Sequence, residues 1–416
     1  MRQLYQLLRQ AVAERERIAL ATVVAPAKGQ EDLLGRKLLI TGSGIYGDLG
    51  NAALTARMRE QAPEFLLQRG AQLVEIAGAC GAAGVFVEPL HPVARLLVLG
   101  GGHIAQPLVA IASLLEYEIT VIDDRPSFAD HRRFPGARSV VCDDFSRALF
   151  RQRFDAGTSV VIVTRGHLHD LECLKQVLPA EPGYVGMIGS RRRIRLVREH
   201  LLAAGFPEEQ VNRVFMPIGL EIGAETPAEI AISIAAQLTE ARRGRGRYPL
   251  PPTSTNEQWQ HLVDVLDHVD RGWPVVAATI VRTRGSTPRK PGVKMLLSAD
   301  GSVRGTIGGG CGEAAVRSEA MMLFDSGAAP GRAGRVPSGR GPGAASIASG
   351  FTARPERRLK APPWLKPAGT PGMRRTGGRG RGAAARLFSV AMDADVDAEE
   401  GMACGGVMDV FLERLV

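Results

Sequence analysis

The sequence has few aromatic residues and no long apolar run. Phe, Tyr and Trp together make up 5% of its 416 residues, whereas 45% of the residues are hydrophobic. This composition is typical of a soluble α/β protein with an aliphatic core. No run of 18 apolar residues occurs, so we expect no membrane span. The amphipathic first 20 residues lack the apolar stretch and cleavage site of a signal peptide, so we expect a cytoplasmic protein.

Cysteine is also scarce. The five cysteines contain no C-x-x-C pair, which argues against both a disulfide framework and a zinc site. Cys80 and Cys142 lie at the ends of apolar strands and Cys173 lies in an apolar helix, where buried structural thiols are common. The two remaining cysteines, Cys311 and Cys404, are flanked by glycines.

The net positive charge comes from one part of the chain. The net charge is +9, but residues 327–392 contain 13 Lys and Arg and a single acid, Glu356. That segment therefore carries +12, and the rest of the chain carries about −3. A basic surface spread over the folded protein is not indicated, so we expect no nucleic-acid partner.

The length predicts two or three domains. The fold class that we expect is α/β, with a Rossmann-like parallel-sheet domain between two small α/β units and a disordered insert near the C-terminus. The expected division is a small unit at 1–90, the Rossmann-like domain at 93–242, a linker at 243–256 and a second small unit at 257–326 plus 393–416.

Residues 327–392 are rich in Gly, Ala, Arg and Pro and show neither a helical nor a strand period. A genuine disordered basic insert would have this composition. Compensating frame errors in a GC-rich gene would produce it too, and we favour that explanation. Resequencing the DNA around codons 325–395 distinguishes the two.

The two small units resemble each other. Arg17–Asn51 and Trp273–Gly310 share an order of strand, Gly-containing loop, second strand, turn and Gly-bearing strand end. The second copy keeps the motifs Ser286–Gly292 and Gly308–Cys311, whereas the first has no cysteine at the corresponding place. We interpret the first as a degenerate copy that serves packing or dimerisation, and we expect a homo-oligomer.

A dinucleotide-binding fingerprint lies in VLGGGHIAQPLVAIASLLEYEITVIDD, which begins at Val98. Gly100, Gly102 and Ala105 give the spacing G-x-G-x-x-A after an apolar strand, and His103 lies in the same turn. Such a turn lets a pyrophosphate approach the backbone at a helix N-terminus. Asp123 ends the next strand, where an acid accepts a hydrogen bond from a ribose 2′-hydroxyl.

Other polar residues follow later strands, at the edge where open α/β sheets bind ligands. Arg165, His167 and His169 come after the strand that ends at Val163. The two histidines would converge on one ligand from a loop, or would cap a helix. Ser190 precedes three arginines and is expected to cap a helix, which makes either a phosphate-facing turn or a solvated basic face.

The second small unit contains the residues best suited to an anionic, metal-bearing ligand. Arg289 and Lys290 lie between two prolines and form a stiff basic loop. Gly308, Gly309 and Gly310 bring backbone N–H groups close to an oxyanion, and Cys311 follows them. A thiolate beside such donors is a good metal ligand or sulfur acceptor. The alternative is a set of Gly-rich turns with structural thiols.

Several motifs together resemble the XdhC/CoxI family. GSTPRKPGVKMLL, GTIGGGCGE and EEGMACGGVMDVFLE are similar to its signature blocks, and VLGGGHIAQPL, VIDDRPSFADHRRFP and YVGMIGSRRR are similar to its C-terminal Rossmann domain. The order departs from the family's usual one, because the cysteine-bearing unit follows the Rossmann domain here.

The resemblance implies a maturation chaperone for molybdenum hydroxylases such as xanthine dehydrogenase and carbon monoxide dehydrogenase. Such a protein would bind the molybdenum cofactor (molybdopterin), support its sulfuration and deliver it to the apoenzyme. A cysteine desulfurase would be a partner. Cys311 would be the metal ligand, and Cys404 a second cofactor-binding residue. The resemblance also implies that the small unit is a dimerising element.

Two other functions are consistent with the residues. The complete glycine turn and Asp123 would suit an NAD(P)-dependent oxidoreductase, but no catalytic acid–base pair accompanies them in the sequence. A Rossmann scaffold for protein contacts is the third interpretation. Fold alone does not determine function. The motifs favour an accessory factor over an enzyme, and we therefore assign no catalytic residue.

Overall fold

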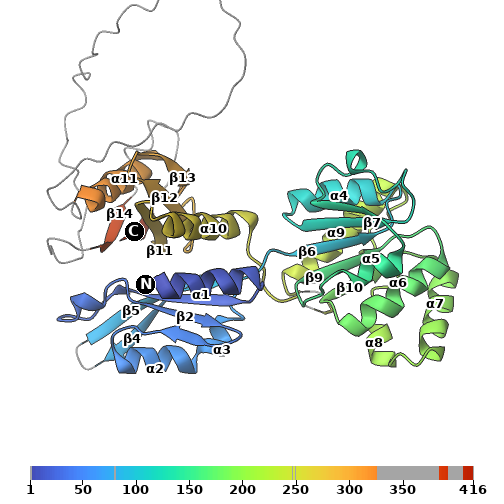
Figure 1. Cartoon of the computed structure of the whole chain (residues 1–416), viewed down its shortest axis with the longest axis horizontal. Coiled ribbons are helices and arrows are strands. Elements are labelled where there is room, and N and C mark those ends of the chain that lie inside the picture. The colour runs from blue at the N-terminus through green and yellow to red at the C-terminus, as the bar shows by residue number, and fades with distance from the viewer. Residues whose placement is uncertain are drawn as a thin grey trace, which may run out of the picture.

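The computed structural model describes residues 2–78, 81–245, 247–248, 250–325, 384–391 and 406–415. Within these residues the strands form three five-stranded sheets, one in each of three units (Figure 1). Cys80 and Cys404 lie outside the described residues, as does most of the segment expected to be frame-shifted. No helix in the described ranges is long and apolar enough to cross a membrane.

The first unit is an antiparallel sheet covered by helices. Its sheet order is β3-β2-β1-β5-β4. Its elements are α1 (Arg2–Ala13), β1 (Ile18–Ala25), η1 (Glu31–Leu33), β2 (Lys37–Thr41), β3 (Ile45–Gly47), α2 (Ala52–Glu60), α3 (Ala62–Phe65), β4 (Gln72–Gly78) and β5 (Gly81–Leu90). Aliphatic side chains from β1, β2 and β5 pack against Leu54 and Met58 of α2 and form its core.

The second unit is a parallel sheet with helices on both faces. Its strands lie in the order β10-β9-β6-β7-β8. The chain adds β7 and β8 on one side of β6 and then β9 and β10 on the other, so the strand order reverses between β6 and β9. Its elements are β6 (Arg95–Leu99), α4 (Ala105–Leu114), β7 (Glu118–Asp123), η2 (His131–Arg133), β8 (Ser139–Cys142), α5 (Phe145–Phe150), β9 (Thr158–Ile162), α6 (His167–Val177), η3 (Leu178–Ala180), β10 (Tyr184–Met187), α7 (Arg191–Ala203), α8 (Glu208–Asn212) and α9 (Pro227–Arg242). The expected α/β class with a Rossmann-like parallel sheet is confirmed.

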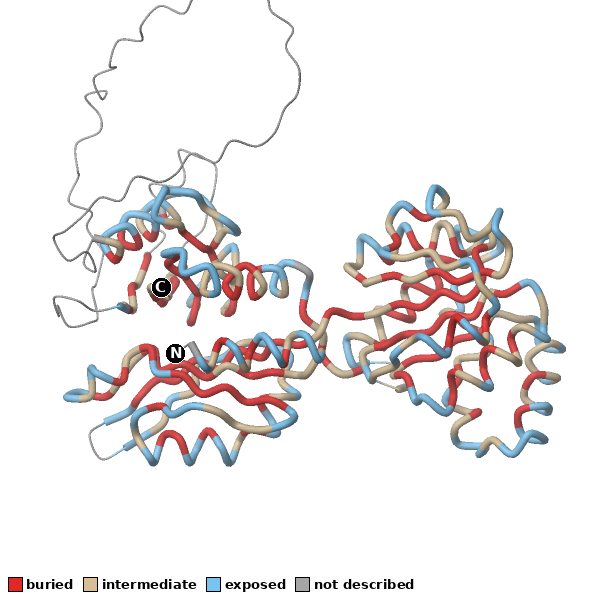
Figure 2. The backbone as a smooth tube through the Cα atoms, in the orientation of Figure 1, coloured by how far each residue is buried: buried red, intermediate tan, exposed pale blue. Residues whose placement is uncertain are grey.

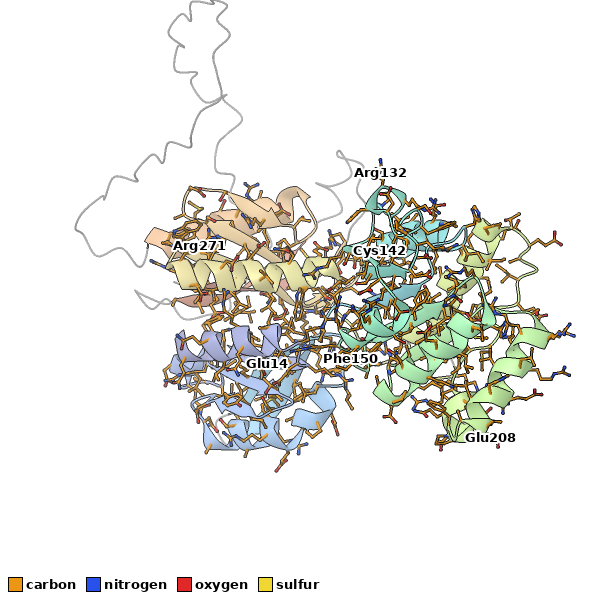
Figure 3. All side chains as sticks on the ribbon, turned by 45° about the vertical axis from the view of Figure 1, so that its right-hand side comes forward. Glu14, Arg132, Cys142, Phe150, Glu208 and Arg271 are labelled. Atoms are coloured by element: carbon orange, nitrogen blue, oxygen red, sulfur yellow. The ribbon has the colours of Figure 1, made fainter. Side chains whose placement is uncertain are left out.

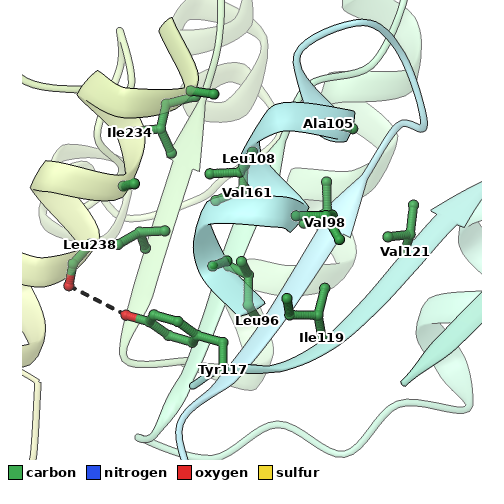
Figure 4. Packing of buried hydrophobic residues seen from close by; sticks show 14 of the residues in the cluster. Leu96, Val98, Ala105, Leu108, Tyr117, Ile119, Val121, Val161, Ile234 and Leu238 are labelled. Carbon is green, nitrogen blue, oxygen red and sulfur yellow. Dashed lines mark hydrogen bonds between the residues drawn. The ribbon is translucent and has the colours of Figure 1, made fainter. Parts of the chain in front are cut away.

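One face of this parallel sheet is covered by α4 and α9. Figure 4 shows Leu108 of α4 and Ile234 of α9 packed over Val98 and Val161 of the sheet. Tyr117 lies below them and donates a hydrogen bond of 3.4 Å to the carbonyl oxygen of Leu238. The aliphatic composition seen in the sequence therefore serves a sheet that is tightly covered on this face.

The third unit repeats the first. Its sheet order, β13-β12-β11-β15-β14, matches strand for strand. Its elements are α10 (Asn256–Arg271), β11 (Val275–Arg284), β12 (Lys294–Ser298), β13 (Val303–Gly305), α11 (Gly310–Asp325), β14 (Ala385–Ala391) and β15 (Val407–Arg414). The glycines that end β3 and β13, Gly47 and Gly305, both have positive φ and both face the carbonyl oxygen of a lysine, Lys37 or Lys294.

Strand β14 corrects one boundary expected from the sequence. It lies inside 327–392, which we expected to lack strands, and it pairs with β15 over seven residues. Phe388 is 1% exposed within the core of the third unit. The apolar run of β14 is short and follows a long Gly- and Arg-rich stretch, so its hydrophobic period was too weak to indicate a strand. The irregular composition therefore ends before residue 384.

The two repeated units pack against each other face to face. Tyr5 and Leu8 of α1 share an apolar cluster with Leu262 and Leu266 of α10, together with residues of both sheets. Figure 1 shows α1 and α10 side by side at this boundary, and Figure 2 shows buried backbone on both sides of it. In Figure 3, side chains fill the space between the two units.

Two ion pairs, one buried and one partly buried, cross this interface reciprocally. Lys37 Nζ of β2 lies 2.8 Å from Glu413 Oε2 of β15, and Lys294 Nζ of β12 lies 2.9 Å from Glu88 Oε2 of β5. Each ammonium also donates to a threonine hydroxyl of its own unit, at 3.2 Å and 3.0 Å. Because corresponding residues of each copy meet the other copy, the units are arranged like the two halves of a twofold dimer.

Candidate functional site

The glycine turn after β6 contains three consecutive glycines with different surroundings. Gly100 has φ +108°, and a Cβ there would lie 2.5 Å from the carbonyl oxygen of Val163. A Cβ on Gly101 would lie 2.5 Å from the carbonyl oxygen of Phe128. Gly102 has no atom within 4 Å of such a Cβ. The first two glycines are therefore required by packing, whereas Gly102 leaves open space at the N-terminus of α4, which begins at buried Ala105.

Asp123, at the end of β7, is held by the protein's own donors. Its side chain is 1% exposed and accepts from the amide N of Gly101 at 2.7 Å. Arg125 donates to it from its backbone N at 3.0 Å, from Nε at 2.9 Å and from Nη2 at 2.9 Å. Burial acts to raise the pKa of Asp123, but these hydrogen bonds outweigh it and lower the pKa below its usual value.

Arg165 and Asp124 link the ends of β9 and β7, the two strands that flank β6. Arg165 follows β9 and donates to both carboxylate oxygens of Asp124, at 2.6 Å and 2.8 Å. The hydrogen bonds from Arg165 are the main cause of a lowered pKa of Asp124. His103, in the glycine turn, is exposed. The structure thus places Arg165, Asp124 and the turn along one edge of the sheet, as the sequence led us to expect for Arg165.

A buried carboxylate lies at the same edge. Asp170 of α6 is fully buried and accepts from Thr164 Oγ1 at 2.6 Å and from Arg193 Nε at 2.5 Å. Burial raises the pKa of Asp170, while the bonds from Thr164 and Arg193 oppose that effect. Ser190 caps α7 as expected, accepting from Arg193 N at 3.3 Å.

The two histidines after β9 do not converge. Both belong to the first turn of α6, where residues two apart point to different sides of a helix. His169 lies against Phe145 of α5, with ring centroids 5.5 Å apart, and its Nδ1 is 3.7 Å from Glu172 Oε2. His167 is exposed. Of the alternatives left open by the sequence, convergence on one ligand required a loop, and the chain after Gly166 is helix.

In the third unit, three motif segments meet. A Cβ on Gly308 would overlap Pro288, and a Cβ on Gly406 would overlap the backbone of Ser286. The loops 285–292 and 306–309 and the chain entering β15 are therefore in close contact. Gly406 was part of a quoted motif but not a predicted site residue, and its G-G pair is the signal that would have identified it.

Three glycines with positive φ form the N-terminus of α11, with φ of +132° and +76° at Gly308 and Gly309 and +67° at Gly310, the first residue of the helix. The amide N of Gly309 donates to Glu313 Oε2 at 3.1 Å, and Thr306 Oγ1 donates to the same oxygen at 2.6 Å. The Glu313 carboxylate therefore already accepts from the Gly309 amide, one of the donors that we expected to bind a ligand. Cys311 is the second residue of the helix, and not the end of the loop; its side chain is not among the described ones.

The first unit closes the equivalent helix end with a side chain. Asn51 precedes α2 as Gly309 precedes α11, and its Oδ1 accepts from the amides of Ala53 and Leu54 at 3.0 Å and 3.2 Å. Ala53 stands where Cys311 stands in the third unit. The first copy thus caps its helix and lacks the thiol, whereas glycine at position 309 has no side chain to cap with.

The basic loop is less preorganised than we expected. Arg289 Nη1 lies 3.6 Å from Glu257 Oε2, and both side chains are more than a third exposed. Lys290 is exposed. Beside the glycines of 308–310, the loop therefore carries Arg289, which is paired with Glu257, and Lys290, which is solvated.

The remaining described cysteines differ in burial. Cys173 is fully buried in α6, and burial raises its thiol pKa well above the usual value. Cys142 is exposed, so its expected buried position was wrong; it ends β8 at the open edge of the sheet. The described part of the chain contains no group of three His, Cys, Asp or Glu side chains that could hold a metal ion.

Two family models match the sequence. The model of the XdhC Rossmann domain matches residues 96–238. The model of the XdhC and CoxI family matches twice, at 11–77 and 268–332, once in each small unit. The same family model thus matches both of the units whose sheets repeat each other.

Three curated proteins are similar to the chain. YqeB of Escherichia coli, an uncharacterized protein, is 27% identical over 237 residues, 54% of this chain and 43% of that protein. A protein of Bacillus subtilis, named as a probable subunit of xanthine dehydrogenase, is 25% identical over 206 residues, 50% of this chain and 57% of that protein. The molybdenum cofactor insertion chaperone PaoD of Escherichia coli is 24% identical over 170 residues, 41% and 47% of the two chains.

The chain thus spans about half the length of the curated relatives it matches. Among solved structures, a crystal structure of a xanthine dehydrogenase from Bacillus halodurans matches with a TM-score of 0.34 and 21% identity, over 58% of this chain and 96% of that one.

Proposed function

Because the chain belongs to the XdhC and CoxI family, we propose that it is a maturation chaperone for molybdenum hydroxylases. It binds the molybdenum cofactor, supports its sulfuration and delivers it to an apoenzyme such as xanthine or carbon monoxide dehydrogenase. The names of two relatives support this role, since one is a molybdenum cofactor insertion chaperone and the other a probable part of a xanthine dehydrogenase. Its partners are the apo hydroxylase and a cysteine desulfurase.

The single observation that carries the proposal is the junction of three glycine-rich segments in the third unit. Gly308 and Gly406 approach the loop 285–292 so closely that no side chain fits at either position. Gly309, by contrast, has open space where a Cβ would be, so an anion can approach its backbone. The residues therefore fit an anionic pterin phosphate as cargo.

The roles divide among the residues of this junction. Arg289 and Lys290 attract the phosphate, and the N–H groups at the start of α11 bind oxyanions of the cargo. Glu313 already accepts from Gly309, so it must rotate away or remain as a hydrogen-bonded neighbour when the cargo binds. Cys311, in the first turn of a helix, supplies a thiolate for the metal or for sulfur transfer. Cys404 is proposed as a second cofactor-binding residue.

An oligomer is also part of the proposal, but through a different surface from the one we expected. The face of the first unit that suggested dimerisation packs on the third unit of the same chain. A second copy would have to bind elsewhere.

The proposal is tested by removing thiols one at a time. Cys311→Ala should abolish co-purification of molybdenum and pterin with little change in melting temperature. Cys173→Ala should lower the melting temperature by removing a buried side chain, and should spare cofactor content. Cys142→Ala is the matched control, because that thiol is exposed, and it should change neither quantity. Unchanged cofactor in Cys311→Ala would defeat the assignment.

The Rossmann domain is the second candidate site. The open space at Gly102 favours a ligand phosphate at the start of α4, as an NAD(P)-dependent oxidoreductase would require. The state of Asp123 restricts which ligand that can be.

A further inference from the structure

Asp123 has no acceptor capacity left. An ionised carboxylate offers about four lone-pair sites, two on each oxygen. Oδ1 accepts from the backbone N and Nε of Arg125, and Oδ2 accepts from Gly101 N and Arg125 Nη2. All four sites are therefore filled by the protein, and a ribose hydroxyl would have to displace one of these donors.

Arg125 is held in this position by more than its ion pair. Its guanidinium carbon lies 3.6 Å from the centroid of the Phe128 ring, which is a close cation–π contact. Arg133 lies over the same ring at 5.1 Å and donates from Nη2 to the carbonyl oxygen of Gly101 at 3.2 Å. The side chain of Arg125 is nonetheless 32% exposed, so one edge of it is accessible to a ligand.

The charges along this edge favour an anion. Arg125 pairs with Asp123 and Arg165 pairs with Asp124, whereas Arg133 contacts the carbonyl oxygen of Gly101, so these five side chains leave one net positive charge. A phosphate monoester carries a charge of about −1.5 to −2 at neutral pH. In Rossmann folds, an arginine next to the acid position accommodates a phosphate attached to the ribose, where the acid alone would read the free hydroxyl.

We propose that Arg125 is a specificity-determining residue of the Rossmann cleft. By saturating Asp123, it prevents recognition of a free ribose 2′-hydroxyl and selects ligands that carry a phosphate monoester. A nucleotide 2′-phosphate and a pterin phosphate share this chemistry. The inference rests on the second candidate site of the proposed function and specifies its ligand class; it does not depend on Cys311.

The test compares Arg125→Ala with a matched control. Arg132 donates to Asp130 from its backbone N, Nε and Nη2, as Arg125 does to Asp123, but it is 90% exposed on the same segment. Binding of NAD⁺, NADP⁺ and 6-hydroxymethylpterin phosphate is measured by calorimetry for wild type, Arg125→Ala and Arg132→Ala. The NADP⁺ and pterin arms distinguish the two sources of the phosphate.

Wild type should bind at least one of the two phosphate monoesters about tenfold or more tightly than NAD⁺. Arg125→Ala should lose that preference and gain NAD⁺ affinity by about tenfold or more, because Asp123 regains lone pairs for a charge-assisted hydrogen bond. Arg132→Ala should behave as wild type. If wild type binds NAD⁺ as tightly as Arg125→Ala does, or binds neither monoester, the inference is overturned.

Removal of Arg125 leaves a buried carboxylate without its cation and could prevent folding. Arg125→Gln keeps a donor for Asp123 while removing the charge, and it should also lose the monoester preference; retention of that preference would contradict the inference. Molybdenum content is measured in the same preparations. Normal molybdenum with no effect at Arg125 overturns this inference alone and leaves the proposed function standing.

Discussion

At the scale of single residues, glycines in the same motif have different roles. Gly101 and Gly102 are adjacent in the turn after β6, yet one is enclosed by backbone and the other faces open space. Sequence alone treats Gly102 as the ligand-facing glycine, and the structure leaves it free for that role. Effects of substitution on folding and on binding should therefore be separable here.

Gly102→Val should fold with an unchanged melting temperature but weaken binding of phosphate-bearing ligands, because the new side chain fills the approach to α4. Gly101→Val should instead cost about 1–3 kcal/mol of unfolding free energy, since its Cβ would meet a backbone carbonyl. Urea unfolding and calorimetry separate the two effects. If Gly102→Val binds every candidate ligand as wild type does, the turn is not a ligand site.

His91 connects pH to stability. It is 2% exposed between the first unit and the Rossmann domain, and its Nε2 lies 2.7 Å from the carbonyl oxygen of Gln68. Burial is the main cause of its lowered pKa. The folded protein therefore keeps His91 neutral, whereas the unfolded chain takes up a proton below about pH 6.5.

The unfolding free energy should consequently be constant above about pH 6.5 and decrease as the pH falls below it. His91→Gln, which can still donate to Gln68, should reduce that decrease. His131→Gln is the control, because His131 is exposed. Urea titrations between pH 8 and pH 5.5 measure the slope; an identical slope in His91→Gln would exclude His91 as its origin.

The residue-level predictions succeeded where one local rule decides the outcome. Ser190 caps a helix as expected, because an oxygen-bearing side chain before a helix accepts from its first amides. Asp123 was placed correctly at a strand end, but its saturation depends on Arg125, two residues further along. The sequence places these two residues near each other but does not give the conformation that joins them.

At the scale of elements, the two copies of one helix end allow a direct comparison. Asn51 caps α2, whereas α11 begins after Gly309, which is in the left-handed region and surrounded by open space. Asparagine tolerates that region better than most residues. The difference between the copies can therefore be reversed by one substitution.

Gly309→Asn should lower molybdenum and pterin content, because a side chain would then occupy the space in front of α11. Gly301→Asn is the matched control, since Gly301 also has positive φ and open surroundings in the turn before β13. Each should cost about 1 kcal/mol of stability. Equal cofactor content in the two variants would contradict a cargo site at α11.

Elements were predictable where the hydrophobic period was uninterrupted. The parallel sheet follows from apolar runs separated by glycine and polar turns, whereas the antiparallel pairing in the two small units was not expected from the sequence. β14 was missed because the long segment before it carries no hydrophobic period. Pairing with β15, the next strand along the chain, and not the local pattern, makes it a strand.

At the scale of the whole molecule, the reciprocal ion pairs determine how the copies associate. Lys37 and Glu413 are each less than a tenth exposed. Lys37→Met should therefore cost about 3–5 kcal/mol, because it leaves a buried carboxylate without its partner. The double variant Lys37→Met, Glu413→Leu should recover most of that loss.

The exposed pair of Arg57 and Glu60 provides the control, and Arg57→Met should cost about 1 kcal/mol or less. Equilibrium urea unfolding measures all of these variants. The Lys294 and Glu88 pair should respond in the same way, since it occupies the equivalent place. If losses at Lys37 and Glu413 simply add, the two side chains do not stabilise each other.

The covalent connection of the two copies changes what can evolve at their interface. Two separate identical protomers would associate only at sufficient concentration, whereas units joined in one chain meet at any dilution. In a homodimer, moreover, each substitution is present on both sides of the axis. In this chain, the first unit alone has Asn51 and Ala53 at the places that Gly309 and Cys311 hold in the third unit. One half can thus specialise as a permanent structural partner, and each chain presents its thiol-bearing helix end a single time.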